Sequence, residues 1–259
     1  MPPPLALVAT GAIILVSWAI GVHHHRQQQR RAAMPRVEES SAAFHGVFTA
    51  KTRDELETAY DQWKGTYDDS IASDLAGDGE NHPTTETLKT LKAALSLQEA
   101  SRVKRVLDVG AGTGAAGPLL VDAFGPLEHL VAFDLSAGML TLAERRGCYT
   151  KVVKGACPDM SAVRPASDEE LYDLIFSAGT FTPNHAPATT LAQLVPLVRR
   201  GGHIAFSIRA YWYEDAQSGF KVAQAELEAK GAWRRVAMEE RPYLPKQNVM
   251  ALYFVYEVL

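Results

Sequence analysis

A short hydrophobic run that ends in three alternate glycines constrains the fold more than any other feature of this sequence. It reads VLDVGAGTG over residues 106–114, and Gly110, Gly112 and Gly114 lead into a helical pattern. Glycine permits a tight turn and lets a ligand lie against bare backbone. The first turn of a helix also offers free N–H groups. The segment therefore predicts a strand, a ligand-binding turn and a helix, in that order.

Strand-like and helical segments alternate after this turn, which predicts an α/β fold with a parallel sheet covered on both faces. The last two strands are separated by only eight residues, too few for a helical crossover, so we expect them to pair as an antiparallel hairpin. The predicted strands are RVLDVG, 129–135, 149–155, 171–179, 203–210, 233–240 and 249–258, and the predicted helices are 52–66, 84–97, AAGPLLVDAF, 136–147, 186–199 and 216–231.

Two acidic residues indicate which ligand the turn binds. A dinucleotide would place a pyrophosphate here, and residues 112–117 do match G-x-G-x-x-G. S-adenosylmethionine has no phosphate but carries an ammonium and a carboxylate. Asp108 lies two residues before Gly110, where it would repel a pyrophosphate and suit an ammonium. Asp134 ends the next predicted strand, where a carboxylate can accept hydrogen bonds from both ribose hydroxyls of either cofactor.

From these motifs the chain resembles the class I S-adenosylmethionine-dependent methyltransferases. VLDVGAGTG is similar to their first motif, VAFDLSAGML to the second, YDLIFSAG to the fourth, and LVRRGGHIAFSIR to the segment around the fifth strand, over about residues 50–259. More narrowly, the chain resembles the Williams–Beuren-region methyltransferase-like family. The segments that carry the narrower resemblance are YDQW…YD from Tyr60, GCY from Gly147, GTF…H from Gly179, SIR from Ser207, and Trp233…Tyr243-Leu244.

The resemblance implies a Rossmann-like sheet in the order 3-2-1-4-5-7-6 with strand 7 antiparallel. It also implies cofactor contacts from Leu135, Met139 and Ser177. One position departs from the superfamily pattern, because Ala156 stands where an acid often contacts the adenine amino group. Either the backbone of Cys157 or the side chain of Asp159 would then take that role. We choose Asp159, for which the alternative is an ordinary solvated carboxylate in a loop.

The acceptor is expected at the carboxyl ends of the fourth and fifth strands, near the switch in strand order. His185 follows the fourth strand and is either a general base or a loop-stabilising residue. Arg209 ends the fifth strand and either binds an acidic acceptor or pairs with a neighbouring carboxylate. Tyr60, Trp63 and Tyr67 precede the core and either form a lid over the sulfonium or pack as an ordinary helix.

The leading hypothesis is a methyltransferase that acts on a small molecule by in-line displacement. A nicotinamide-dependent reductase is the first alternative, although the only Tyr-x-x-x-Lys spacing, Tyr60 to Lys64, precedes the glycine turn. A non-catalytic S-adenosylmethionine-binding protein is the second. We predict no metal site, because the histidines lack ligand spacing and the two cysteines, Cys148 and Cys157, are too few for a thiolate zinc site.

The N-terminus is predicted to be a membrane anchor. Residues 5–22 carry no charge over a length near that of a bilayer span, and four arginines with no acid lie within residues 1–36. The positive-inside rule then places the catalytic domain on the cytoplasmic side. A cleaved targeting segment and a peripheral or buried helix are the alternatives. We predict an anchor over 1–22, a linker over 23–50, and a methyltransferase domain over 51–259 with a helical lid over 51–100.

The charge of the body bears on its partners. The whole chain has a formal net charge of −4, with 26 basic and 30 acidic residues, so the part after residue 36 has 22 basic residues and a net charge of −8. An acidic body argues against a nucleic-acid partner. We expect a monomer whose partners are a small-molecule methyl acceptor and, through residues 5–22, a membrane.

Overall fold

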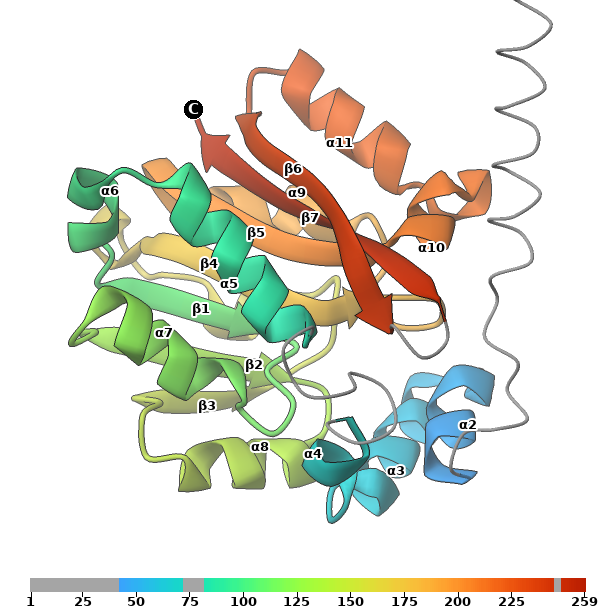
Figure 1. Cartoon of the computed structure of the whole chain (residues 1–259). Coiled ribbons are helices and arrows are strands. Elements are labelled where there is room, and N and C mark those ends of the chain that lie inside the picture. Colours follow the sequence, from blue (N-terminus) through green and yellow to red (C-terminus); the bar gives the residue numbers. More distant parts are fainter. Residues whose placement is uncertain (1–41, 72–81, 245–247) are drawn as a thin grey trace, which may run out of the picture. The chain divides into compact units, whose positions relative to one another are not determined.

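The computed structural model describes residues 42–71, 82–244 and 248–259. Seven strands form one sheet in the order β3-β2-β1-β4-β5-β7-β6 (Figure 1). Neighbouring strands from β3 to β5 are parallel, and β7 runs antiparallel to both β5 and β6. This is the order and the hairpin that the sequence predicted. The strands are β1 (Arg105–Val109), β2 (His129–Asp134), β3 (Lys151–Lys154), β4 (Tyr172–Phe181), β5 (Val198–Arg209), β6 (Trp233–Leu244) and β7 (Val249–Val258).

Helices cover both faces of the sheet because the buried side chains of each strand alternate between them. Leu107 and Ile175 pack into the cluster that includes Leu191 of α9 and Leu227 of α11. The adjacent Val106, Leu174 and Phe176 pack instead with α5 and α7. The helices are α2 (Ala42–Thr49), α3 (Arg53–Trp63), α4 (Tyr67–Ser70), α5 (Pro83–Ala94), α6 (Leu97–Ser101), α7 (Ala116–Phe124), α8 (Ala137–Arg145), α9 (Thr190–Leu194), α10 (Ala210–Glu214) and α11 (Phe220–Ala229).

Three short helices, α2, α3 and α4, lie together on the side of the sheet toward which β1 and β2 point (Figure 1). The hydroxyl of Thr52 accepts a hydrogen bond from the Glu55 N–H and so begins α3, where Asp54 and Glu55 also suit the positive end of the helix. Leu56 and Trp63 of α3 are buried in a cluster with Tyr253 of β7. These helices therefore form a cover above the carboxyl ends of the central strands.

Three predicted boundaries differ from the structure. The predicted linker 23–50 contains helix α2, because Val47 is buried in the same cluster as Leu56 and Trp63. The predicted lid 51–100 is two structures, since α5 packs on the sheet and only its first turn, Pro83 and Thr84, lines the smaller cavity. The predicted helix 186–199 shrinks to α9 and one 3-10 turn that contains Pro196, after which Val198 pairs with Tyr172 and extends β5.

The predicted anchor, residues 5–22, lies outside the described residues. Among the helices that are described, none combines the length and the apolar character needed to cross a membrane.

Candidate functional site

The turn after β1 has the conformation that its glycines predict. Gly110, Gly112 and Gly114 all have φ between +55° and +77°, a region that other residues rarely adopt. A Cβ on Gly114 would lie 2.8 Å from the Cα of Ala143, so this glycine also lets α8 approach the turn. A Cβ on Gly112 would meet nothing within 4 Å. The backbone at Gly112 is therefore open to a ligand.

Asp108 lies at the bottom of the site and is 2% exposed. Its Oδ2 accepts a hydrogen bond of 2.7 Å from the hydroxyl of Tyr149. Burial raises the pKa of the Asp108 carboxyl to about 7, although the hydrogen bond from Tyr149 works in the opposite direction. A buried carboxyl without a cation beside it suits a ligand that brings a positive charge.

Asp134 ends β2 and holds the turn from the other side. Its Oδ2 accepts from the Gly112 N–H at 2.8 Å, and its Oδ1 accepts from the Ser136 N–H at 2.9 Å. Burial still raises the pKa of this carboxyl above its ordinary value, while these backbone hydrogen bonds lower it. A carboxylate oxygen has two lone pairs, so each oxygen can accept one further hydrogen bond from a ligand hydroxyl.

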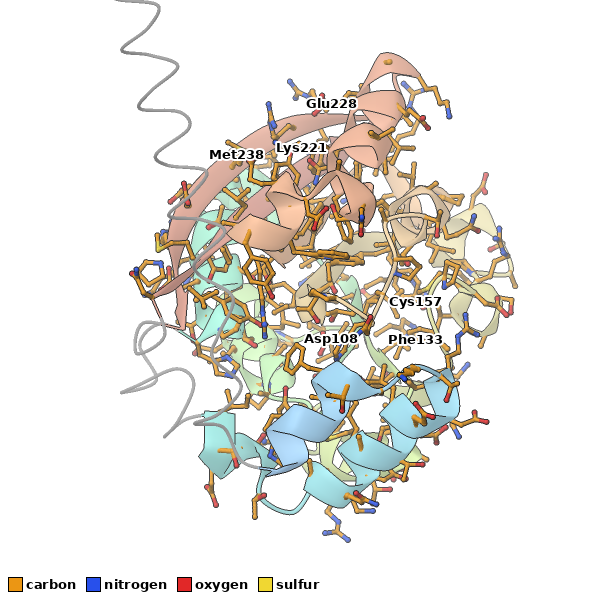
Figure 2. All side chains as sticks on the ribbon, turned by 90° about the vertical axis from the view of Figure 1, so that its right-hand side faces the viewer. Asp108, Phe133, Cys157, Lys221, Glu228 and Met238 are labelled. Atoms are coloured by element: carbon orange, nitrogen blue, oxygen red, sulfur yellow. The ribbon has the colours of Figure 1, made fainter. Side chains whose placement is uncertain are left out.

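Two cavities meet above the turn, one of about 90 Å³ and one of about 260 Å³. Gly110, Gly112, Tyr60, Tyr67 and His185 are among the residues that line both. Figure 2 shows Asp108, Phe133 and Cys157 near the edge of the sheet that faces α2 and α3, far from Glu228 and Met238. The larger cavity is lined by Phe133, Asp134, Leu135, Met139 and Cys157, and the smaller by Asp108, Thr182, Arg209 and Tyr243.

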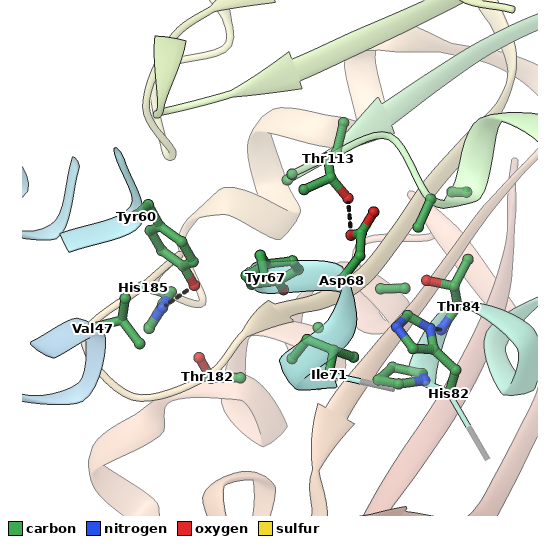
Figure 3. A pocket seen from close by; sticks show the side chains of 18 of the residues that line it. Val47, Tyr60, Tyr67, Asp68, Ile71, His82, Thr84, Thr113, Thr182 and His185 are labelled. Carbon is green, nitrogen blue, oxygen red and sulfur yellow. Dashed lines mark hydrogen bonds between the residues drawn. The ribbon is translucent and has the colours of Figure 1, made fainter. Parts of the chain in front are cut away.

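Two carboxylates hold α3 and α4 in place, Asp61 at the start of α8 and Asp68 at the turn after β1. Asp61 accepts hydrogen bonds from the Ser136 hydroxyl at 2.6 Å and from the Gly138 N–H at 3.1 Å. Asp68 accepts from the Thr113 hydroxyl at 2.5 Å, as Figure 3 shows, and pairs with Arg146. The rings of Tyr60, Trp63 and Tyr67 pack against one another, with Tyr60 stacked on Trp63 and Tyr67 edge-on to Trp63, and all three residues line the smaller cavity.

His185 and Tyr60 form a hydrogen-bonded pair at the junction of the two cavities (Figure 3). The His185 Nε2 lies 2.7 Å from the Tyr60 hydroxyl, and its Nδ1 lies 2.8 Å from the Pro183 carbonyl oxygen. A carbonyl can only accept, so Nδ1 carries the proton and Nε2 accepts from Tyr60. Burial lowers the pKa of His185 to about 4, so the ring is neutral at pH 7. This neutral ring is a weak base.

Arg209 ends β5 and reaches the smaller cavity. It is 4% exposed, and its guanidinium stacks on the rings of Phe48 and Tyr243 at 4.8 and 5.1 Å. One Nη1 hydrogen bond of 3.3 Å goes to the hydroxyl of Tyr211. No carboxylate of the described residues forms an ion pair with it, so of the two predicted alternatives the structure does not show pairing with a neighbouring acid.

The structure does not bring two predicted cofactor contacts to the cavities. Asp159 is exposed, and its carboxylate accepts a hydrogen bond from the Ser161 N–H at 2.9 Å. Ser177 is completely buried and donates to the Val109 carbonyl oxygen at 2.9 Å, which ties β4 to the end of β1. Both lie outside the residues that line either cavity. Cys157, the alternative to Asp159, does line the larger one.

Several site residues were missed at the sequence level. Thr182 and Phe48 reach the smaller cavity from a loop and from α2. Asp61 and Asp68 lie next to the predicted aromatic residues, but the sequence did not predict that their carboxylates would bond to Ser136, Gly138 and Thr113. Nothing in the local pattern of Thr182 or Phe48 distinguishes them from other loop and helix residues.

In the part of the chain that the structure describes, no three His, Cys, Asp or Glu side chains gather where they could hold a metal ion.

Comparison with known proteins agrees with this geometry. Residues 106–202 match the family described as methyltransferase domain. This part of the chain is similar to methyltransferase domains. Its curated relatives include two malonyl-[acyl-carrier protein] O-methyltransferases. The one from Anoxybacillus flavithermus is 33% identical over 46% of this chain and 44% of its own length. The one from Acetivibrio thermocellus is 31% identical over 53% of this chain and 47% of its own length. The chain thus spans less than half the length of these relatives.

Solved structures show the same fold at low sequence identity. The [4+2]-cyclase SpnF has a TM-score of 0.59 and 13% identity, and the match covers 81% of this chain and 97% of that one. The N-methyltransferase NodS from Bradyrhizobium japonicum, in complex with S-adenosylhomocysteine, has a TM-score of 0.51 and 17% identity over 75% and 97%. The names of these proteins describe different reactions, so the likeness establishes the fold of the methyltransferase domain and leaves its reaction to the site.

The described residues of the two cavities fit S-adenosylmethionine, the cofactor that the sequence predicts. Asp108 offers a buried carboxyl without a cation, which suits the ammonium of the methionine moiety. Asp134 has acceptor capacity left for the ribose hydroxyls, and Leu135 and Met139 line the same cavity for the adenine. The bare backbone of Gly112 lies in both cavities and so stands between these two ends of the ligand.

Proposed function

We propose that this protein is an S-adenosylmethionine-dependent methyltransferase that acts on a small-molecule acceptor by in-line displacement. One observation carries the proposal: Asp108 and Asp134, on adjacent strands, lie on two cavities that meet at the open backbone of Gly112. An acid at the first position disfavours a pyrophosphate and favours an ammonium. The match of residues 106–202 to a methyltransferase domain supports the same conclusion.

The bound cofactor would supply a methyl group already activated by the sulfonium. As the acceptor atom forms its bond to the methyl carbon, the carbon–sulfur bond breaks and its electron pair goes to sulfur. The chain therefore contributes mainly proximity and alignment. Asp108 and Asp134 fix the two ends of the ligand, and α3 and α4, fastened through Asp61 and Asp68, keep water from the reacting atoms.

The neutral, hydrogen-bonded state of His185 bears on whether the acceptor has a general base. Its Nε2 lone pair already accepts from Tyr60, and burial lowers its pKa to about 4. In this arrangement His185 is poorly suited to the predicted role of general base. An acceptor that is already deprotonated near pH 7 needs no base. His185 then serves to position the Tyr60 ring against the cofactor.

Binding and turnover test the proposal against its two alternatives. We expect the full chain to bind S-adenosylmethionine and not NADPH in a calorimetric titration, which separates a methyltransferase from a reductase. We further expect S-adenosylhomocysteine to form when a metabolite extract is added. Binding without turnover across such extracts would favour a non-catalytic S-adenosylmethionine-binding protein.

The narrower family and the acceptor are part of the proposal. Tyr149, within the GCY segment, binds Asp108, and Tyr60 lines the site, which supports a place in the Williams–Beuren-region methyltransferase-like family. The curated relatives are named for a malonyl group on an acyl carrier protein. An acyl group carried in this way is thus one acceptor to include in the turnover assay.

We also propose that residues 5–22 anchor the protein to a membrane with the methyltransferase domain on the cytoplasmic side. The uncharged run and the arginines that follow it support this. The full chain should sediment with membranes and resist carbonate extraction, while a chain that begins at Val37 should stay in the supernatant and bind cofactor. A mass lower by about 2 kDa would indicate cleavage instead.

A further inference from the structure

The guanidinium of Arg209 lacks the partner that a buried charge requires. Its Nε is fully buried and has no hydrogen-bond partner among the described residues. The rest of the guanidinium interacts with the hydroxyls of Tyr211 and Tyr243 and with the ring faces of Phe48 and Tyr243. Buried charges in proteins are normally paired, because an unpaired donor costs its full desolvation free energy. An anion from outside the chain would complete this site.

A second buried polar group without a partner lines the same cavity. Thr182 is 4% exposed, and its Oγ1 forms no hydrogen bond with any described residue. Thr182 and Arg209 both line the smaller cavity, and Figure 3 shows Thr182 there with Tyr60 and His185. Five buried side-chain atoms of the described residues have no partner, and Thr182 Oγ1 and Arg209 Nε are the two whose residues line this cavity, so one ligand bound there would satisfy both.

These two groups stand apart from the place where the methionine moiety of the cofactor is expected. Asp108 pairs with Phe176 of β4, which pairs with Ala205 of β5, and Arg209 lies four residues further along β5. Two strand spacings across and four residues along separate the Cα atoms of Asp108 and Arg209 by about 16 Å. The ammonium and the carboxylate of methionine share one carbon atom. We assign Arg209 to the acceptor on this spacing, and the Kd of an Arg209 variant for S-adenosylhomocysteine decides between the acceptor and the methionine carboxylate.

The charges that face the cavity limit the anion to a single negative charge. His185 and His82 also line it, and burial lowers the pKa of both rings, so Arg209 is its only cationic side chain among the described residues. Asp68 is satisfied by Thr113 and Arg146. Asp108, at the other end, would repel a second negative charge. One guanidinium and one hydroxyl suit a carboxylate better than a phosphate dianion.

We propose that Arg209 Nε and Thr182 Oγ1 bind a carboxylate of the methyl acceptor, so that the substrates of this enzyme are small carboxylic acids or molecules that carry one. The inference rests on the proposed methyl transfer and adds the substrate class. The carboxylate orients the acceptor over the ends of β4 and β5, beside the Tyr60–His185 pair.

Turnover on a fractionated extract tests the substrate class. The full chain is incubated with methyl-labelled S-adenosylmethionine and a metabolite extract split by anion exchange at pH 7. We expect labelled product from the retained fraction only. The label should disappear when that fraction is first amidated with carbodiimide and ammonia, and it should survive phosphatase treatment. Label from the unretained or the amidated fraction would overturn the proposal.

Variants test the two residues. Arg209→Gln should raise the KM for the active fraction at least 30-fold and Thr182→Val about fivefold. The Kd for S-adenosylhomocysteine should change less than twofold in both. The exposed Arg235→Gln is the matched control and should change neither value. If Arg209→Gln weakens S-adenosylhomocysteine binding as much as acceptor use, Arg209 holds the carboxylate of the cofactor and the proposal fails.

A binding experiment keeps the inference separate from the proposed function. Acetate and butyrate are titrated into the complex with S-adenosylhomocysteine, with acetamide and butyramide as neutral counterparts. We expect the acids alone to bind, and Arg209→Lys to retain part of the affinity if Arg209→Gln does not fold. Equal binding of acids and amides, or none of either, overturns the carboxylate site. Failure of the wild-type chain to bind S-adenosylhomocysteine instead overturns the proposed function.

Discussion

The two halves of the site satisfy their polar groups in different ways. On the cofactor side, each oxygen of Asp134 accepts a backbone N–H, and Asp108 accepts from Tyr149. On the acceptor side, Arg209 Nε and Thr182 Oγ1 have no partner among the described residues. The first set is held by the chain before any ligand arrives. The second set depends on the ligand.

The halves also differ in how the chain assembles them. The cofactor side comes from one continuous βαβαβ segment, β1 through β3. The acceptor side joins α2, α3, the loop after β4, the end of β5 and the β6 strand. The residues of the cofactor side therefore lie close together in the sequence. Those of the acceptor side come from distant segments that only tertiary packing brings together. Mutations on the two sides should therefore differ in what they change.

The largest effect is expected on the cofactor side. Asp134→Ala removes the acceptor of two backbone N–H groups and the hydrogen bonds to ribose, so the affinity for S-adenosylmethionine should fall by about 1.5–3 kcal/mol. Calorimetric titration of the folded variant measures this. Asp159→Ala, on an exposed loop carboxylate outside both cavities, is the control and should bind normally. An unchanged Kd in Asp134→Ala would remove this residue from the site.

A pH dependence of intermediate size should come from Asp108. Burial raises the pKa of its carboxyl to about 7 in the folded protein, so below that pH the group is neutral and cannot balance an ammonium. Affinity for S-adenosylhomocysteine should increase about tenfold or more from pH 5.5 to 7.5. Asp108→Asn should bind weakly at both values and lose this dependence. A flat profile in the wild type would argue that Asp108 does not meet the ammonium.

The smallest effect is expected where the two halves meet. Tyr60→Phe removes the hydrogen bond to His185 but keeps the ring that stacks with Trp63 and Tyr67. Turnover should fall about three- to tenfold, the effect of one lost hydrogen bond, with little change in cofactor Kd. Because the pKa of His185 is about 4, the wild-type rate should show no ionisation of His185 between pH 5 and 8. Such an ionisation, lost in His185→Gln, would restore the general-base hypothesis.

The sequence reached the sheet and the cofactor turn because their signals are local. Strand runs, the alternate glycines, and the short link between the last two strands each lie within a few residues, and the structure has the predicted strand order. Tertiary packing decides which of the predicted site residues line the cavities, and two of them do not. Ser177 matched a motif yet points into the core to hold Val109, and Asp159 stands at a suitable spacing yet caps Ser161 on the surface.

What the sequence by itself determined is the half of the site that one stretch of chain builds: a strand, a glycine turn, and acids at fixed distances from both. Backbone conformation and side-chain alternation follow from neighbouring residues, so the places of these residues can be predicted from the local sequence. Only the tertiary structure decided that Arg209 lacks a carboxylate, that Thr182 shares its cavity, and that His185 is neutral behind Tyr60. Burial and pairing depend on segments far apart in the chain, and no local pattern encodes them.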